Sequence, residues 1–454
     1  MNNFCWLEFL TRHRPGIKAR EPLAAKCLPP GPSARQGPIS QLAGHDEWVK
    51  SASFPPAITD WRWHQPMRPR DIAQKHRSST PLELLFDLVF VVAVSRAVKG
   101  LVTQVQAGEL GRGLMVFMMV FLAIWWAWAN FAWFASAYDV DDGPYRLLVM
   151  LQMAGVLVLA AGVDSLGRTA NLKVITIGYA IMRLALAIQW LRAGRGHPAG
   201  RATTRRYAIG ISVLQVGWVA RLALPETTTW NMVSFGLMGL MELAVPVIAE
   251  RARRTNWHPH HIAERYSLFV IILLGESVLA AVSGLRNDVP LFDRDWGSIT
   301  VAACSLILLF ALWWIYFLVP VGDGLIKRRH IAFRWSYVHA LVFFALALLG
   351  AGLDLAVSVA ESTPGNISAF GSCTVLAIAV GLFMVGWWLQ SSVARGWWGL
   401  RTHLGVTLGA LALSPVVALT PAGMVGGAVA VTAVTCCSTA WLVLLHERFI
   451  KLTG

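Results

Sequence analysis

Residues 79–101, STPLELLFDLVFVVAVSRAVKGL, decide the fold of this chain. Thr80 and Glu83 have the spacing of a capping box, in which each side chain accepts a hydrogen bond from the other residue's backbone amide, and Pro81 fits the first helical position. The following apolar run is long enough to enter a bilayer as a helix. Asp87 lies one turn after Glu83 on the same helix face and would be costly in lipid. The stretch therefore predicts a membrane-spanning helix whose acidic face contacts protein or water.

The composition extends this prediction to the whole chain. Hydrophobic residues make up 56% of the 454 residues and charged residues only 14%, which is outside the usual range of a soluble domain. The apolar residues occur in runs of about 20, the length that spans a bilayer as a helix, and the 21 Trp residues suit interfacial aromatic belts. We therefore expect an all-α, polytopic transmembrane helical bundle.

Twelve membrane-spanning segments are predicted from these apolar runs. Their approximate ranges are 82–103, 114–136, 145–165, 173–193, 205–224, 230–250, 262–284, 296–319, 335–355, 370–391, 398–419 and 423–446. Residues 1–77 contain many prolines and basic residues and no apolar run long enough to span, so we interpret them as a disordered, basic cytoplasmic tail. Met67, rather than Met1, could then be the true start, and deleting residues 1–66 should leave folding intact.

The net charge of +14 is concentrated in every second loop. The basic residues of these loops are Arg192, Arg195, Arg201, Arg205, Arg206, Arg251, Arg253, Arg254, Arg265, Lys327, Arg328, Arg329, Arg334, Arg395 and Arg401. By the positive-inside rule both termini are cytoplasmic, and the protein lies in the plasma (inner) membrane. This arrangement favours anionic lipid over nucleic acid as the partner of the basic surface.

Two tryptophan pairs indicate an internal repeat. Trp125-Trp126 in the second predicted span and Trp313-Trp314 in the eighth stand at the same distances before Arg146 and Arg334, respectively. Spans six apart share an orientation, so the pattern predicts a parallel six-plus-six duplication. The two membrane halves would cover residues 78–250 and 251–454.

Ionisable residues inside the predicted spans are the candidates for a functional site. They are Glu83, Asp87, Arg183, Glu242, Glu264 and Glu276. One interpretation is structural: Glu83 only caps its helix, and Arg183 pairs with Asp87 or Glu276 as a buried brace. The other is functional: Asp87 and Glu276 face one central cavity between the halves and bind a cation or relay protons. No metal or cofactor site and no catalytic motif is evident in the sequence.

Two stretches carry a family resemblance. TPLELLFDLVFVVAVSRAV, from Thr80, and HIAERYSLF, from His261 and followed by Gly275-Glu276-Ser277, resemble the typical stretches of the bacterial low temperature requirement protein A family. The resemblance covers roughly residues 78 to 450. It implies a role in growth in the cold, without specifying a biochemical activity.

A transporter or ion-conducting protein is the first functional hypothesis, because the chain combines the repeat, the acidic groups in spans one and seven and the lack of a catalytic domain. A membrane-embedded enzyme acting on lipid is the second, and it would need a polar cluster such as His339 and His403 with an acid. A membrane component that is needed for growth in the cold but transports nothing is the third.

Overall fold

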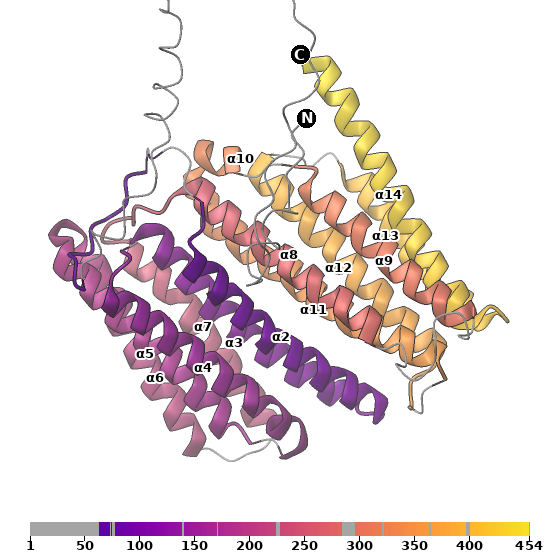
Figure 1. The fold of residues 1–454 in the computed structure, drawn as a ribbon, viewed down its shortest axis with the longest axis horizontal. Coiled ribbons are helices and arrows are strands. Elements are labelled where there is room, and N and C mark those ends of the chain that lie inside the picture. The colour runs from indigo at the N-terminus through magenta and orange to yellow at the C-terminus, as the bar shows by residue number, and fades with distance from the viewer. Residues whose placement is uncertain are drawn as a thin grey trace, which may run out of the picture. The chain divides into compact units, whose positions relative to one another are not determined.

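The computed structural model describes residues 63–453, except for 73, 75–77, 139, 170, 224–227, 284–295, 320–321, 363–364 and 396–399. Within these residues the chain forms helices and no strands (Figure 1). The first group of long helices is α2 (Pro81–Gln106), α3 (Leu110–Ala137), α4 (Gly143–Thr169), α5 (Lys173–Gly196), α6 (Arg201–Ala220) and α7 (Thr228–Glu250). The second group is α8 (Pro259–Ser283), α9 (Trp296–Phe317), the short α10 (Gly322–Lys327), α11 (Ala332–Ala360), α12 (Ala369–Arg395), α13 (Arg401–Leu413) and α14 (Gly423–Thr453).

The predicted helical membrane bundle is confirmed. Eleven of the predicted spans each coincide with one long helix, and the other, 398–419, covers the shorter α13 and a 3₁₀ segment, Ser414–Leu419. Nine helices of the described residues are long and apolar enough to cross a membrane. The other three long helices, α2, α6 and α8, each contain three or more charged residues. Twelve crossings therefore remain a prediction.

The two groups of helices share part of their packing order. In the first, α2 packs on α3 and α4, α4 on α5, α5 on α6, and α6 on α7; in the second, α8 packs on α9 and α11, α11 on α12, α12 on α13, and α13 on α14. In the second group, however, α14 also packs closely on α9, and no comparable packing of α7 on α3 is found among the described residues. The duplication therefore remains a prediction. The groups meet where α2 contacts α8 and α11 (Figure 1).

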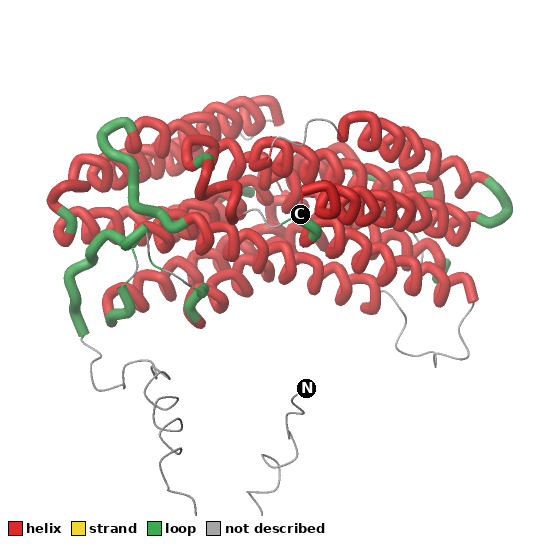
Figure 2. The backbone as a smooth tube through the Cα atoms, turned by 90° about the horizontal axis from the view of Figure 1, so that it is seen from above, coloured by secondary structure: helices red, strands yellow, loops and turns green. Residues whose placement is uncertain are grey.

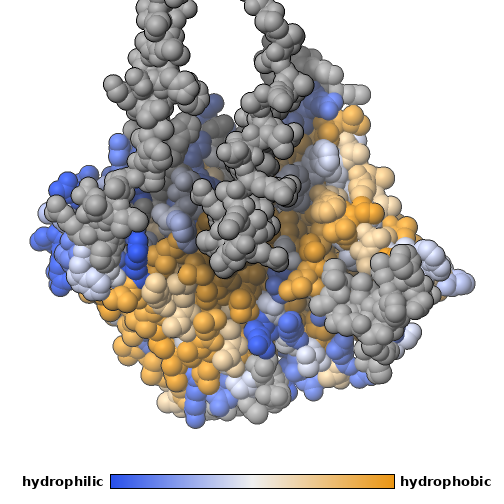
Figure 3. Space-filling view, viewed as in Figure 1, coloured by the Kyte–Doolittle hydropathy of each residue, from blue (hydrophilic) through white to orange (hydrophobic). Residues whose placement is uncertain are grey.

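The helices differ in how much of their surface contacts other helices. In α11, which contacts both α2 and α8, 78% of the most apolar stretch is buried. In α7 and in α13 the corresponding share is only 28%. The helices run alongside one another, with loops mainly at their ends (Figure 2). Apolar side chains cover much of the face seen in Figure 3, and hydrophilic ones gather mainly near the helix ends. This is the surface expected of a bundle that faces lipid around its middle.

Residues 63–72, assigned to the tail from the sequence, form a strap that lies on the bundle. The Gln65 amide donates a hydrogen bond of 2.8 Å to Asp142 Oδ2, and Arg192 Nη2 donates one of 3.0 Å to the Gln65 carbonyl. Met67 is only 1% exposed. Other backbone contacts of the strap are with Ala137, Gly143 and Asn256. The strap therefore belongs with the bundle rather than with the predicted tail; residues 1–62 lie outside the described part.

Truncation should reveal this contribution. Deleting residues 1–67 should lower the free energy of unfolding by about 1.5–3 kcal/mol, because it removes the buried Met67 side chain as well as the bonds to Asp142 and Arg192. A chain that begins at residue 63 is the control. Thermal unfolding in detergent measures the difference, and equal midpoints for the two truncated proteins would show that the strap adds no stability.

Candidate functional site

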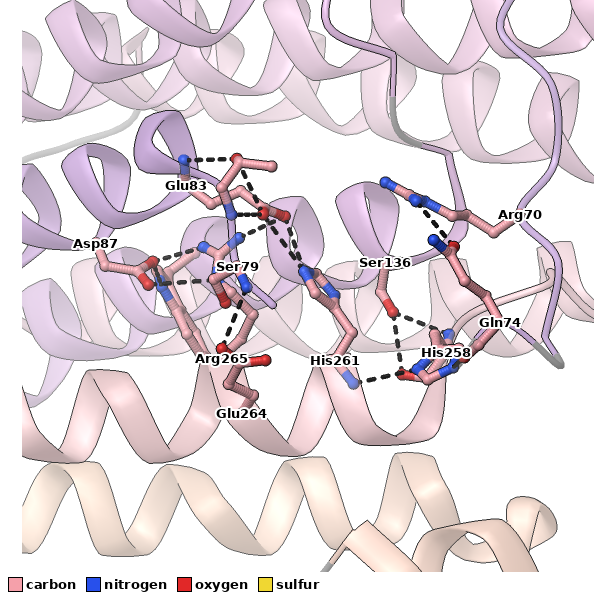
Figure 4. A network of polar contacts seen from close by, with 12 residues as sticks. Arg70, Gln74, Ser79, Glu83, Asp87, Ser136, His258, His261, Glu264 and Arg265 are labelled. Carbon is pink, nitrogen blue, oxygen red and sulfur yellow. Dashed lines mark hydrogen bonds and ion pairs between the residues drawn. The ribbon is translucent and has the colours of Figure 1, made fainter. Parts of the chain in front are cut away.

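Two groups of polar side chains lie where α2 meets α8. The first, here called the charged network, consists of Glu83 and Asp87 from α2 and His261 and Arg265 from α8 (Figure 4). The second, here called the polar pocket, is a cavity of about 150 Å³ between α2, α8 and α11. Its ionisable and hydroxyl side chains are Ser95, Lys99, Glu276, Ser277 and Asp354.

The charged network begins at the start of α2. Thr80 Oγ1 accepts a hydrogen bond of 3.3 Å from the Glu83 amide, and Glu83 Oε2 accepts one of 2.8 Å from the Thr80 amide. The predicted capping box is therefore present, with Pro81 at the first helical position. This local arrangement fixes the Glu83 side chain over the first turn, where it faces α8.

Replacing Thr80 by alanine should cost about 1 kcal/mol of stability, because the Glu83 amide loses its acceptor at the helix start. Thr80→Ser keeps the hydroxyl and is the matched control. Thermal unfolding of the purified variants in detergent checks the expectation. If the alanine and serine proteins unfold at the same temperature, the cap does not contribute measurably.

Arg265 binds both carboxylates of the network. Its Nη1 lies 3.0 Å from Glu83 Oε1 and its Nη2 lies 2.5 Å from Asp87 Oδ1. Arg265 Nε also donates a hydrogen bond of 3.2 Å to Asp87 Oδ2, and Trp128 of α3 donates a third, of 2.7 Å, to Asp87 Oδ1. Asp87 and Arg265 are completely buried. The network therefore binds the first helix of one group to the first helix of the other in the bundle interior.

His261 completes the network. Its Nε2 lies 3.2 Å from Glu83 Oε1. Glu83 and Asp87 carry two negative charges when ionised, whereas Arg265 supplies one positive charge. His261 and Arg265 thus give the Glu83 carboxylate two partners on α8.

Two sequence-based expectations about these residues are wrong. Glu83 does more than cap its helix, because it also contacts His261 and Arg265. The partner of Asp87 is Arg265, which had been counted with the basic loop residues, and not Arg183. Arg265 stands within the second of the two resembling stretches, directly after Glu264. The sequence therefore offered one indication of this pairing. Arg265 stands in a stretch that carries the family resemblance, and the acidic face of α2 needed a cation as its partner.

Glu264 also connects the two stretches, because its Oε1 accepts a hydrogen bond of 3.1 Å from the Ser79 amide just before α2 (Figure 4). This contact holds the entry to α2 against α8. The two stretches that carry the family resemblance thus form one contact region, although 178 residues separate Asp87 from Arg265.

Arg183 and Glu242 form a separate buried pair within the first group of helices. Arg183 Nη2 of α5 lies 2.7 Å from Glu242 Oε2 of α7. The Glu242 carboxylate also accepts hydrogen bonds from Trp126, Tyr179, Gln215 and Trp218. Five donors from α3, α5 and α6 therefore hold this carboxylate, an arrangement that stabilises the packing of α7 on its neighbours.

The polar pocket lies further along α8 than the charged network. Glu276 follows Arg265 by eleven residues, which corresponds to about 16 Å along a helix. The Ser95 hydroxyl of α2 donates a hydrogen bond to the Glu276 carboxylate. Asp87 does not line this cavity. The hypothesis that Asp87 and Glu276 share one central cavity is therefore wrong, because they belong to separate sites.

Aromatic side chains fill the space between the network and the pocket. Phe269 lies one turn after Arg265 on α8, and its ring packs on Trp128 of α3 and Phe343 of α11, with centroid distances of 4.4 and 5.0 Å. All three rings are almost fully buried. The polar pocket is thus separated from the charged network by a packed apolar layer.

The two histidines considered for an enzyme do not share a hydrogen-bond partner. His339 Nε2 lies 2.9 Å from the Tyr316 hydroxyl, whereas His403 Nε2 lies 2.9 Å from the Ser438 hydroxyl. In the described part of the chain no carboxylate forms an ion pair with either histidine. The described residues also contain no group of three or more His, Cys, Asp or Glu able to hold a metal ion.

These features define an integral membrane protein in which two groups of helices enclose charged side chains where they meet. Residues 78–438 match the family described as Bacterial low temperature requirement A protein (LtrA). The chain therefore belongs to this family, and the matched range begins just before α2 and includes both the charged network and the polar pocket.

A relative of this chain is the uncharacterized protein RA0937 of Rhizobium meliloti (strain 1021). The two are 28% identical over 242 residues, which is 52% of this chain and 57% of the relative. The chain thus spans little more than half the length of that relative. The likeness adds no activity to the family assignment.

Proposed function

We propose that the protein is a transporter or ion-conducting protein that moves a small cation and binds it in the polar pocket. One observation carries the proposal: an apolar bundle contains a cavity into which Glu276, Asp354 and Lys99 project from three different helices. Glu276 and Asp354 are partly buried, whereas Lys99 is exposed. Ionisable groups within membrane-spanning helices are typical of ion and proton pathways.

The chemistry of the pocket suits a cation. Two carboxylates and one ammonium group leave one net negative charge when all three are ionised. The hydroxyls of Ser95 and Ser277 line the same cavity and add neutral oxygen atoms, and oxygen ligands are those that hard cations prefer. A volume of about 150 Å³ has room for roughly five water molecules, so a partly hydrated ion would fit.

Access to the pocket is asymmetric along the helices. Glu276 and Asp354 stand seven and six residues before the ends of α8 and α11, respectively, or about 10 Å from that end of the bundle. Between the pocket and the other end of the bundle lie first the layer of aromatic side chains around Phe269 and then the charged network. If the predicted topology holds, the pocket faces the exterior and the network faces the cytoplasm. Alternating access would then require the ion pairs of Arg265 to rearrange, as expected when one repeat moves against the other.

The second candidate, an enzyme acting on lipid, has one observation in its favour, the hydrogen bond between His403 and Ser438. A hydroxyl nucleophile activated by histidine normally needs a third group that orients the base, such as a carboxylate. The described residues provide no acid as partner of His403. We therefore favour transport, with the lipid bilayer as the environment and anionic lipid at the basic loops.

Flux measurements test the proposal directly. The full chain is reconstituted in liposomes that contain a pH-sensitive or a cation-sensitive dye, and gradients of H⁺, Na⁺, K⁺ and Mg²⁺ are applied in turn. We expect flux of at least one of these ions above that of empty liposomes and of liposomes with a heat-denatured sample. Background flux for every cation would contradict the proposed function.

A further inference from the structure

A second and larger cavity lies within the first group of helices and shares no residue with the polar pocket. Its volume is about 640 Å³, within the range of small-molecule sites. Helices α3, α4, α5, α6 and α7 supply its walls. The lining is almost entirely apolar and includes Met115, Met118, Met119, Trp125, Met232 and Phe235. Flexible methionine side chains adapt to apolar ligands of irregular shape.

The cavity is open toward the surface that faces lipid. Met118 and Met232, on opposite walls, are 50% and 53% exposed, and α7 is one of the least buried of the spanning helices. Between Met232 and Leu243 the wall of α7 extends for about 16 Å, close to half of a hydrocarbon core of about 30 Å. The cavity therefore runs about as deep as one leaflet and is accessible from the side.

Arg221 lies at the end of α6 and lines this cavity. Its side chain is buried, with only 6% of the residue exposed, and donates hydrogen bonds to Ser234 Oγ (2.6 Å) and to the Asn231 carbonyl (2.8 Å). In the described part of the chain, which lacks residues 224–227, no carboxylate forms an ion pair with Arg221. Because a buried cation is stabilised by an opposite charge, this site is suited to an anionic group.

At the other end of the cavity, the charged side chain is already paired. Glu242 reaches its wall, but its carboxylate already accepts five hydrogen bonds, including the one from Arg183. An amphiphile would therefore place its anionic group at Arg221 and its apolar part toward Glu242 and Trp126.

We propose that this cavity binds one acyl chain of an anionic phospholipid of the bilayer, with the lipid phosphate paired to Arg221. Arginine suits this role because its planar donors match the oxygen atoms of a phosphate. A phospholipid is favoured over a free solute because the cavity opens to the hydrocarbon region and has the depth of one leaflet. The site is independent of the proposed ion pathway.

A glycine in the cavity wall allows the cavity to be filled by mutation, and a second glycine elsewhere provides a control. Gly239 lines it, and a Cβ atom added there would meet no atom within 4 Å. A phenylalanine at this position should therefore meet no obstruction at its Cβ atom, and its ring should extend into the lipid site. Gly409 of α13 is equally unobstructed but does not line the cavity, so Gly409→Phe is the matched control.

Native mass spectrometry of the full chain, delipidated in detergent and titrated with phosphatidylglycerol or phosphatidylcholine, provides the test. The wild-type protein should retain phosphatidylglycerol more tightly. Arg221→Gln should weaken that binding about ten-fold, as expected for a hydrogen-bonded charge, and should weaken phosphatidylcholine less, because the choline group already offsets the charge of its phosphate. Gly239→Phe should abolish retention of both lipids, whereas Gly409→Phe should bind as the wild type does.

Three results would overturn the proposal. Equal retention of the two lipids by the wild type would remove the role of the anionic group, and unchanged binding by a folded Gly239→Phe protein would exclude this cavity. A stronger adduct with oleate than with phosphatidylglycerol would identify a free fatty acid, rather than a bilayer lipid, as the ligand. Thermal unfolding of each variant verifies that binding is measured on folded protein.

Discussion

Replacing Arg265 by methionine should destabilise the folded protein by about 3–5 kcal/mol, the range observed when one partner of a buried ion pair is removed. The side chain is fully buried and contacts two carboxylates. Without it, Glu83 and Asp87 would be left about one helical turn apart, in a site that water does not reach. The thermal unfolding midpoint in detergent should fall accordingly, and the amount of protein inserted in the membrane should fall with it.

Two further variants test whether the loss of stability comes from the unpaired carboxylates rather than from the loss of a positive charge in general. Arg253→Met removes a positive charge from an exposed position in the loop before α8 and should leave the midpoint nearly unchanged. Combining Arg265→Met with Glu83→Gln and Asp87→Asn removes the unpaired negative charges and should recover most of the lost stability. If Arg265→Met alone unfolds like the wild type, the network does not hold α2 against α8.

Signals that act over a few residues predicted the fold well. The capping box at Thr80 and Glu83 depends on residues three positions apart, and the structure shows both of its hydrogen bonds. The apolar runs required only length and composition to identify helices, and all but one of the predicted ranges coincide with a single long helix. Both kinds of signal are local, since helix formation satisfies backbone groups within the same segment.

The partners of the buried charges were not predictable in the same way. The cost of burying Asp87 in lipid indicated that it needed a partner, but not which cation would supply it. Arg183 was favoured because it stands in an apolar span; it pairs instead with Glu242, 59 residues away, while Arg265 pairs with Asp87 over 178 residues. Such pairings depend on how the helices are rotated and placed against one another, which apolar periodicity leaves undetermined.

The strap was also not predicted from the sequence, because its contacts are with distant parts of the chain. Proline and basic residues before α2 indicated disorder, because composition describes the average tendency of a segment. A few specific contacts nevertheless hold residues 63–72, among them the Gln65 amide on Asp142 and the buried Met67. The acceptor, Asp142, lies at the start of α4, far from Gln65 in the sequence. Only the folded chain shows that it accepts the hydrogen bond from the Gln65 amide.

Replacing Glu276 by glutamine should reduce cation flux in proteoliposomes about ten-fold or more, because the substitution removes a charge–ligand interaction while keeping the size of the side chain. Stability should change little. Glu276 is only partly buried, and glutamine retains an oxygen that can accept the hydrogen bond from Ser95. Asp354→Asn, in the same pocket, should also reduce flux, since it removes the second carboxylate.

The control is Glu109→Gln, which neutralises an exposed carboxylate at the end of the bundle nearest the pocket. Its flux should match that of the wild type, so that a general effect of surface charge is separated from binding in the pocket. Flux should also be recorded against pH: if the translocated ion is a proton, Glu276→Gln should flatten the dependence as well as lower the rate. A folded Glu276→Gln protein with wild-type flux for every ion would exclude the polar pocket as the binding site, whereas loss of flux in Glu109→Gln as well would place the effect at the surface.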